Sequence, residues 1–305
     1  MHRLFLPIII GTLLFTGKVN AASSPLDIVD DAELTRPFPD EIGKFLDQHA
    51  PLADAPTRIK QLERRVVDPS APAPATQGAP SGASLHYSEA AKGVALISSV
   101  YKCDKCNNWH LRGVAGAWGL DEKGLMVTNY HVFATNQDPA FGVKFKDGRT
   151  LPVTEILAAS KEADCAVFRV DLGPEKKPLN VLPLAESPAE VGERVHALSH
   201  PDGRFFTFTS GEVSRYYKQK GKNPAIWMSI TAEYAKGSSG CPILNDRGEV
   251  VGMVANTQSI YYGVQSPPPG QPSAGLRKSD QFASPLQMVI KNTVPISAIK
   301  DLLKK

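Results

Sequence analysis

The chain has 305 residues, of which 42% are hydrophobic, and its 34 Lys and Arg residues nearly balance 31 Asp and Glu residues. A net charge of +3, with basic residues scattered along the chain, gives no dense positive surface, so nucleic acid is not an expected partner. The length allows two average domains, or one β-rich domain with extensions.

The first segment, residues 1–21, has the pattern of a signal peptide. Arg3 precedes a nearly uninterrupted apolar run over residues 4–15, and small residues follow up to Ala21. The run is shorter than the about 20 residues that a membrane-spanning helix needs. We expect cleavage after Ala21 and an exported protein, periplasmic or secreted, without stable membrane insertion. A retained membrane anchor is the alternative.

Residues 22–84 are expected to form an N-terminal arm and linker. Prolines interrupt the segment, and residues 40–49 and 57–67 are each compatible with a short helix. Residues 68–84 are rich in Pro, Ala, Ser and Gly and have too little apolar area to pack. The composition favours a disordered spacer, and a pro-segment or docking arm is the alternative.

The four cysteines allow three complete pairings, and the sequence does not choose among them. Cys103 and Cys106 form a CxxC motif, which in an exported protein favours a local disulfide. His110 lies nearby, but a second pair of ligands at zinc-finger spacing is missing. We therefore expect neither a metal nor another cofactor, and free thiols are the alternative to the disulfide.

From about residue 85 the pattern changes to short apolar runs separated by polar turns that contain glycine. Many short strands with such turns favour an all-β barrel or sandwich over a parallel sheet. Residues 295–305 are expected to form a helix, with proline in its first turn. A Pro-, Gly- and Ser-rich surface loop is expected at 266–284. The expected strands cover residues 93–101, 113–120, 124–129, 141–145, 165–170, 194–198, 205–208, 226–230 and 249–255.

Three segments in this β-rich region carry residue types suited to nucleophilic catalysis. His131 ends a strand, and an imidazole can take up and release a proton near neutral pH. Asp164 stands at the start of an apolar run, where a carboxylate can orient such an imidazole. Ser239 lies in a glycine-flanked turn, although a serine hydroxyl is a poor nucleophile without a base. Each of these signals is weak alone. Their occurrence in the order His, Asp, Ser in an all-β chain favours one catalytic site that contains all three residues.

These segments resemble the trypsin-like serine proteases, most closely the HtrA/Deg-type branch. The string VTNYHV at 127–132 is similar to the histidine motif, ADCAVFRV at 163–170 to the aspartate motif, and GSSGCP at 237–242 to the serine motif. VHALSHPDG, SGEVSR and the closing TVPISAIKDLLKK also fall at matching places. The resemblance covers about 220 residues, 85–305, and implies two six-stranded antiparallel β-barrels followed by a short C-terminal helix. It ends without residues for a PDZ domain.

The resemblance implies roles for particular residues. His131 corresponds to the general base, Asp164 to the acid that orients it, and Ser239 to the nucleophile, since the serine of the family directly precedes the glycine that here is Gly240. Ser238 is the rival nucleophile. The backbone N–H groups of Gly237 and Ser239 correspond to the oxyanion hole. The expected function is therefore an exported serine endopeptidase that acts on proteins or peptides through an acyl-enzyme.

Differences from the family pattern leave alternative interpretations of the site and of the function open. Cys241 replaces the second glycine after the nucleophile, and a bond from it to Cys165 would join the two barrels. Glu233 lies six residues before Ser239 and is the candidate for the base of the substrate pocket, with Tyr234 as the alternative. A protease-fold binding or scaffold protein with an idle or latched triad is the alternative function. The sequence does not indicate the oligomeric state.

Overall fold

The computed structural model describes residues 26–48, 55–65, 82–134, 140–219, 224–262 and 285–304. The expected signal peptide at 1–21, most of the 68–84 linker and the 266–284 loop lie outside the described residues. None of the helices within the described ranges is long and apolar enough to cross a membrane.

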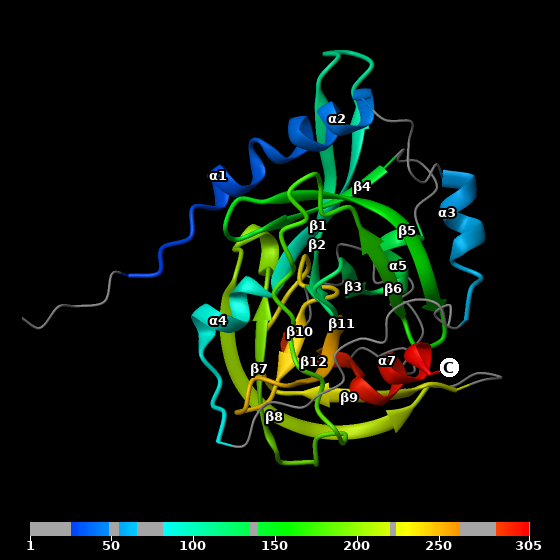
Figure 1. Cartoon of the computed structure of the whole chain (residues 1–305). Helices are drawn as coiled ribbons and strands as arrows, with labels where there is room; N and C mark the ends of the chain where they lie inside the picture. The colour runs from blue at the N-terminus through cyan, green and yellow to red at the C-terminus, as the bar shows by residue number, and fades with distance from the viewer. Residues whose placement is uncertain are drawn as a thin grey trace, which may run out of the picture.

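Twelve strands form two closed barrels, as the resemblance predicted (Figure 1). The first barrel has the strand order β1-β2-β3-β6-β5-β4, and the second has the order β7-β8-β9-β12-β11-β10, which is the same arrangement again. All the paired strands are antiparallel. The strands of the first barrel are β1 Val94–Lys102, β2 Trp109–Gly119, β3 Leu125–Thr128, β4 Ala140–Phe145, β5 Thr150–Ser160 and β6 Cys165–Val170.

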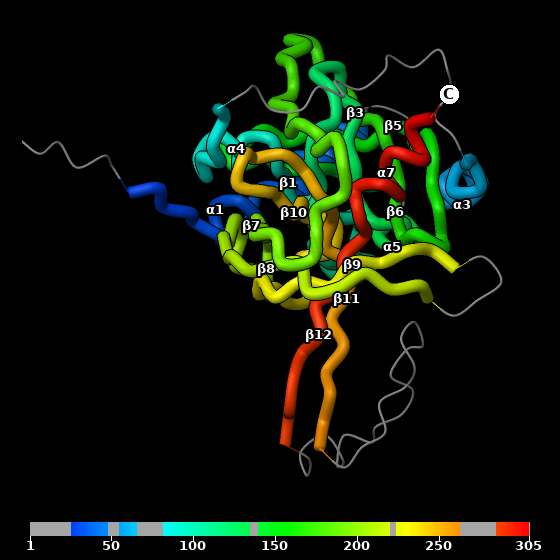
Figure 2. The backbone as a smooth tube through the Cα atoms, turned by 90° about the horizontal axis from the view of Figure 1, so that it is seen from below, coloured from blue at the N-terminus to red at the C-terminus, as the bar shows by residue number. Residues whose placement is uncertain are grey.

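The second barrel follows in the chain and ends in a helix. Its strands are β7 Arg194–Ser199, β8 Thr207–Lys218, β9 Ile226–Ile230, β10 Pro242–Leu244, β11 Val250–Tyr261 and β12 Leu286–Pro295. Figure 2 shows β11 and β12 continuing beyond the body as a two-stranded ribbon. Helix α7, Ile296–Leu303, buries Ile296, Ile299 and Leu302, which confirms the predicted C-terminal helix.

The strand prediction was correct for most of the buried strands and missed β5, β10, most of β8 and most of β12. Strand β5 was missed because two register shifts and a proline break its alternation. Strand β8 was recognised only at its first residues, since most of its side chains are exposed or half-buried and do not form an apolar run. Strand β10 has three residues, too few to show a period.

The N-terminal arm packs on the first barrel instead of forming a spacer. It contains α1 Asp31–Thr35, α2 Phe38–Gln48 and α3 Ala55–Gln61. Phe38 and Ile42 of α2 are fully buried, with 0% and 1% of their surface exposed. Glu41 accepts hydrogen bonds from Lys144 Nζ at 2.7 Å and Thr150 Oγ1 at 2.5 Å. The apolar face of the amphipathic helix α2 makes these contacts, which the average composition of residues 22–84 does not indicate.

Two further α-helices and one short 3-10 helix, η1 Pro201–Gly203, complete the described part of the chain. Helix α4, Tyr87–Lys92, leads into β1, and the short α5, Tyr130–Phe133, follows β3. Helix α3 lies along β5, where Gln61 Oε1 accepts a hydrogen bond of 2.8 Å from Ile156 N. The buried Arg58 on the same helix donates from Nε to the Phe133 carbonyl at 3.3 Å. The arm therefore contacts the segment that carries His131.

Candidate active site

Three loops meet where the two barrels contact each other. His131 lies on α5, directly after β3, and Asp164 lies in the turn that precedes β6. Ser239 lies in the turn that precedes β10, so it comes from the other barrel. The amide of Gly116 on β2 donates to the Ser239 carbonyl at 2.6 Å and ties this turn to the first barrel.

The imidazole of His131 is held by the carboxylate of Asp164. Nδ1 lies 2.9 Å from Oδ2 and 3.0 Å from Oδ1, and the His131 backbone N–H donates to Oδ1 at 3.1 Å. A carboxylate only accepts, so Nδ1 of the neutral imidazole carries the proton and Nε2 keeps its lone pair. The side chain of His131 is 49% exposed and that of Asp164 is 14% exposed. This arrangement leaves Nε2 available as a base.

The backbone of Asp164 has an unusual conformation and is hydrogen-bonded to the end of β3. Its φ of 53° is unusual for a residue other than glycine. The side-chain amide of Asn129 donates to the Asp164 carbonyl at 2.8 Å and joins the end of β3 to this turn. The two loops that carry the imidazole and the carboxylate are therefore attached to each other directly.

Ser239 lines a cavity of about 410 Å³ together with His131. Its Oγ donates to the Ala255 carbonyl at 3.2 Å, and the described contacts include no hydrogen bond between this Oγ and His131. A rotation of the serine side chain would therefore be needed for the hydroxyl to meet the imidazole. Ser238 is 0% exposed, so the rival serine has no access to a substrate.

Two backbone amides of the serine turn have no hydrogen-bond acceptor within the described part of the chain. Among the described residues, the N–H groups of Gly237 and Ser239 donate no hydrogen bond. Asp202 N donates to the Lys236 carbonyl at 2.7 Å. Because the C=O and N–H of a trans peptide point in opposite directions, this bond turns the Gly237 N–H away from Asp202. Unpartnered N–H groups next to a serine hydroxyl are what an oxyanion hole offers.

The two glycines of this turn are required by its geometry. Gly237 has φ of 98°, and a Cβ there would lie 2.7 Å from the His200 carbonyl. Gly240 has φ of 84°, and a Cβ there would lie 2.1 Å from the carbonyl of Gly116. Any larger residue at position 240 would push the serine turn away from the first barrel.

The structure does not bring Glu233 into the cavity. Its side chain is 75% exposed, and its Oε2 accepts a hydrogen bond of 2.6 Å from Lys291 Nζ. The cavity wall contains Tyr234, the alternative, whose hydroxyl donates to the Asn292 carbonyl at 2.7 Å. Burial raises the pKa of Tyr234 well above its ordinary value. Among the described residues, no carboxylate lines this cavity. Its lining is His131, Tyr234, Ala235, Lys236, Ser239, Val254, Ala255, Asn256 and Thr257.

The four cysteines are free thiols in the structure, so neither disulfide considered for them is present. Cys165 contacts helix α7, where its Sγ lies 3.9 Å from the Ala298 carbonyl, and burial raises its pKa to about 12. Cys241 is fully buried, which raises its thiol pKa further. Both behave as small buried apolar residues, which explains why Cys241 is tolerated beside the serine turn.

The sequence did not single out His200, which lies beneath the serine turn. Its ring is fully buried, with Nδ1 accepting from Phe206 N at 3.1 Å and Nε2 lying 3.4 Å from the Ala95 carbonyl. Burial lowers the pKa of His200 to about 4. The neutral ring is therefore a structural link from the second barrel to β1. Its only sequence signal was its position before the Pro-Asp-Gly turn.

This buried histidine predicts a loss of stability in acid. The unfolded chain binds a proton at His200 below about pH 6.5, but the folded chain excludes it down to about pH 4. Stability is therefore complete above the unfolded pKa and falls as the pH drops from 6.5 to 4, by about 3 kcal/mol. Urea unfolding of the wild type and of His200→Gln across this range measures the effect. The exposed His86→Gln should keep the wild-type slope, and an unchanged slope in His200→Gln would contradict the assignment.

Comparison with known proteins agrees with this geometry. Residues 114–253, which span His131, Asp164 and Ser239, match the family model of the trypsin-like peptidase domain. This stretch of the chain is similar to a trypsin-like peptidase domain. Within the matched range, His131 follows β3, Asp164 precedes β6 and Ser239 precedes β10.

Curated relatives of the trypsin-like peptidase domain are serine proteases. A "Probable periplasmic serine endoprotease DegP-like" of Brucella suis is 33% identical over 155 residues, which is 50% of this chain and 29% of the relative. "Protease Do-like 5, chloroplastic" of Arabidopsis thaliana is 27% identical over 62% of this chain and 58% of its own length. "Serine protease HTRA2, mitochondrial" of Drosophila virilis is 30% identical over 48% of this chain and 34% of its own length. The chain thus spans less than two thirds of the length of these relatives.

Proposed function

We propose that the chain is an exported serine endopeptidase that hydrolyses peptide bonds through an acyl-enzyme. The observation that carries the proposal is the cavity shared by His131 and Ser239, with the Asp164 carboxylate behind the imidazole. Proteins or peptides are the proposed substrates. The chemistry requires neither metal nor organic cofactor, because base, nucleophile and oxyanion donors all come from the chain.

The proposed reaction begins when Ser239 Oγ turns from the Ala255 carbonyl toward His131 Nε2. Nε2 takes the hydroxyl proton as Oγ bonds to the substrate carbonyl carbon. The oxygen of the tetrahedral intermediate receives hydrogen bonds from the Gly237 and Ser239 amides. The carbon–nitrogen bond then breaks, and the imidazolium gives its proton to the leaving amine. Water, activated by the same Nε2, attacks the acyl-enzyme and releases Ser239.

We propose that the cavity next to Ser239 takes an uncharged side chain of the substrate. Its walls combine Tyr234, Val254 and Ala255 with the polar Asn256 and Thr257. A pocket that selects Lys or Arg requires a carboxylate to pair with the cation. Glu233 is engaged by Lys291 and is not among the residues that line the cavity. Basic cleavage specificity, which the sequence left open through Glu233, is therefore disfavoured.

The proposed organisation of the chain has three parts. Residues 1–21 are the signal peptide, 22–84 the arm and linker, and 85–305 the peptidase domain. The DegP-like relative of Brucella is named as periplasmic, which agrees with the apolar N-terminal run. The proposed location is the periplasm or the exterior. N-terminal sequencing of the exported chain tests this: a start at Ala22 supports removal of the signal, and retention of Met1 supports the anchor.

One observation favours a second candidate function, a protease-fold binding or scaffold protein with an idle or latched site. The Ser239 hydroxyl is bonded to the Ala255 carbonyl instead of the imidazole. In addition, Arg58 of the arm holds the Phe133 carbonyl, two residues beyond His131. Through this hydrogen bond, the arm can hold α5 in a fixed position.

A fluorophosphonate probe separates the two functions, because it forms a phosphorus–oxygen bond only with an activated serine and releases fluoride. The peptidase proposal expects labelling of the full chain, blocked in Ser239→Ala and retained in Ser238→Ala. Absence of labelling in the full chain, together with intact folding, would contradict the peptidase and support the idle site. A peptide library digested by unlabelled protein then shows whether uncharged or basic residues are preferred at the cleaved bond.

A further inference from the structure

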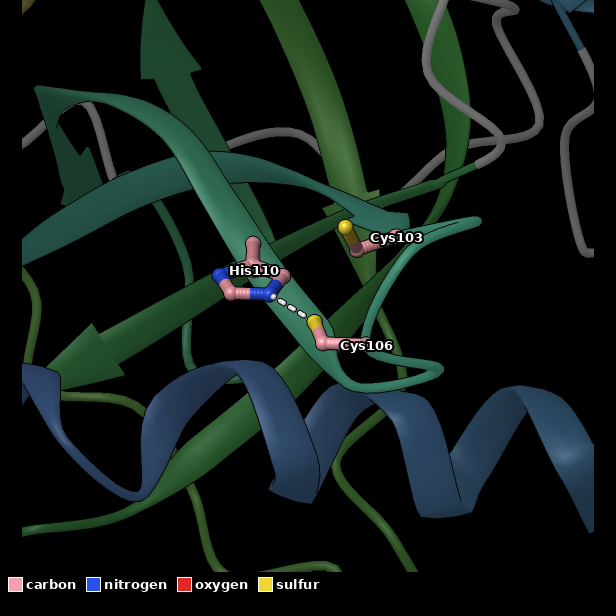
Figure 3. Close-up of side chains that lie close together, drawn as sticks. All are labelled: Cys103, Cys106 and His110. Carbon is pink, nitrogen blue, oxygen red and sulfur yellow. Dashed lines mark hydrogen bonds between the residues drawn. The ribbon is translucent and has the colours of Figure 1, made fainter.

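A second cluster of reactive side chains lies at the end of the β1–β2 hairpin, apart from the catalytic cavity. It consists of Cys103, Cys106 and His110, which we call the hairpin cluster (Figure 3). The possible ligand atoms of the three residues lie within 4.8 Å of one another. The CxxC motif had suggested a disulfide, but the fold adds a histidine to the two sulfurs. Two sulfurs from the turn and an imidazole from the start of β2 are a different chemical arrangement from a pair of thiols.

The spacing of the hairpin cluster fits a tetrahedral metal ion. With Zn–S bonds of about 2.3 Å and Zn–N bonds of about 2.0–2.1 Å, neighbouring ligand atoms lie about 3.5–3.8 Å apart. His110 Nε2 lies 3.1 Å from Cys106 Sγ, as the dashed line in Figure 3 marks. Small side-chain rotations therefore bring all three atoms to one ion. Among the described residues, no further His, Cys, Asp or Glu joins this group.

The backbone holds the ligands in place. Cys103 N donates to the Asn108 carbonyl at 2.9 Å, and Asn107 N donates to the Cys103 carbonyl at 2.8 Å, closing the loop. Asn107 has φ of 58°, which turns the chain back toward β2. The ring of His110 stacks on Tyr101, with centroids 5.6 Å apart. Hydrogen bonds from the backbone N–H groups of Cys106 and Lys105 lower the pKa of the Cys103 thiol.

We propose that the hairpin cluster binds a zinc ion through Cys103 Sγ, Cys106 Sγ and His110 Nε2. The fourth tetrahedral position is left for water or an outside ligand, since three protein ligands are present. Binding to two thiols and a neutral imidazole releases up to two protons as the thiolates form. The proposal is independent of the peptidase chemistry, because the cluster shares no residue with the cavity at Ser239.

Zinc bound to the hairpin cluster would also stabilise the packing of the N-terminal arm. Trp109, between two of the ligands in sequence, packs on Gly43 of α2, where a Cβ would lie only 2.1 Å from Trp109 Cδ1. Figure 3 shows α2 passing beside the cluster. A metal that fixes Cys106 and His110 also fixes the indole on which α2 rests. Zinc binding is therefore expected to slow the opening of α2.

Cobalt and zinc titrations of the reduced full chain test the proposal. Cobalt should give sulfur-to-metal charge-transfer absorption with the visible bands of a tetrahedral site, and one equivalent of zinc should displace it. Loss of an outer-shell partner already costs about 10–100-fold in metal affinity, so Cys106→Ser and His110→Gln should each lose more than about 100-fold. Cys165→Ala is the matched control, because that buried thiol is remote from the cluster and should leave the affinity unchanged.

Three outcomes would overturn the site. They are cobalt binding without charge-transfer bands, metal affinities of the two ligand variants equal to that of Cys165→Ala, and a Cys103–Cys106 disulfide in the isolated chain with no zinc uptake after reduction. Hydrogen exchange of α2 provides a second readout: faster exchange after chelation supports the link to the arm. Unchanged exchange in a chain that does bind zinc would overturn that link alone.

Discussion

Replacing Ser239 by alanine is expected to lower kcat for peptide hydrolysis by a factor on the order of 10⁶, the loss seen when the nucleophile of a comparable triad is removed. The reason is that Ser239 Oγ would form the covalent bond to the substrate, and no other hydroxyl lines the cavity from the same turn. Steady-state rates on an unfolded protein substrate measure the change. KM should move little, because the hydroxyl contributes little to ground-state binding.

Ser238→Ala is the matched control for this experiment. Its Oγ is buried and has no partner among the described residues, so removal of the hydroxyl breaks no hydrogen bond. Turnover should stay near the wild-type value. If Ser238→Ala loses as much activity as Ser239→Ala, or if Ser239→Ala keeps its activity, the assignment of the nucleophile is wrong.

Asp164→Asn is expected to lower kcat by a factor of about 10⁴ without unfolding the chain. The carboxylate accepts from Nδ1 and from the His131 amide, and an asparagine amide can donate to Nδ1 instead. The imidazole would then carry its proton on Nε2 and be unable to take one from Ser239. Turnover measured beside a thermal unfolding curve separates this effect from loss of structure.

Asp171→Asn provides the control for the acid. Asp171 is exposed at the other end of β6 and accepts a hydrogen bond from Gly173 N at 2.9 Å. Its substitution should leave turnover unchanged. A large loss in Asp171→Asn with full activity in Asp164→Asn would show that Asp164 does not orient the histidine.

The arm shows where sequence reasoning failed, and why. Its prolines and its Pro-, Ala-, Ser- and Gly-rich end favoured a spacer, yet Phe38 and Ile42 are buried against the first barrel. The apolar face of α2 is short, so averaging over the whole arm concealed it. The Glu41–Lys144 pair joins residues 103 positions apart, and no local pattern indicates such a contact.

The substrate pocket gives a second example. Counting back from Ser239 placed Glu233 at the pocket base, but its side chain points to Lys291 on β12. Lys291 comes 58 residues later in the chain, so the sequence around Glu233 contains no sign of this partner. Tyr234, one position further on, is the neighbour that lines the cavity.

The sequence by itself determined the fold class and the order of the His, Asp and Ser motifs, because the strand pattern and the motifs are local features of the chain. Only the tertiary structure decided which residues share the cavity and which serine is accessible. The physical reason is that such contacts join strands far apart in the chain, whose register is set by barrel closure and burial and leaves no trace in local residue patterns.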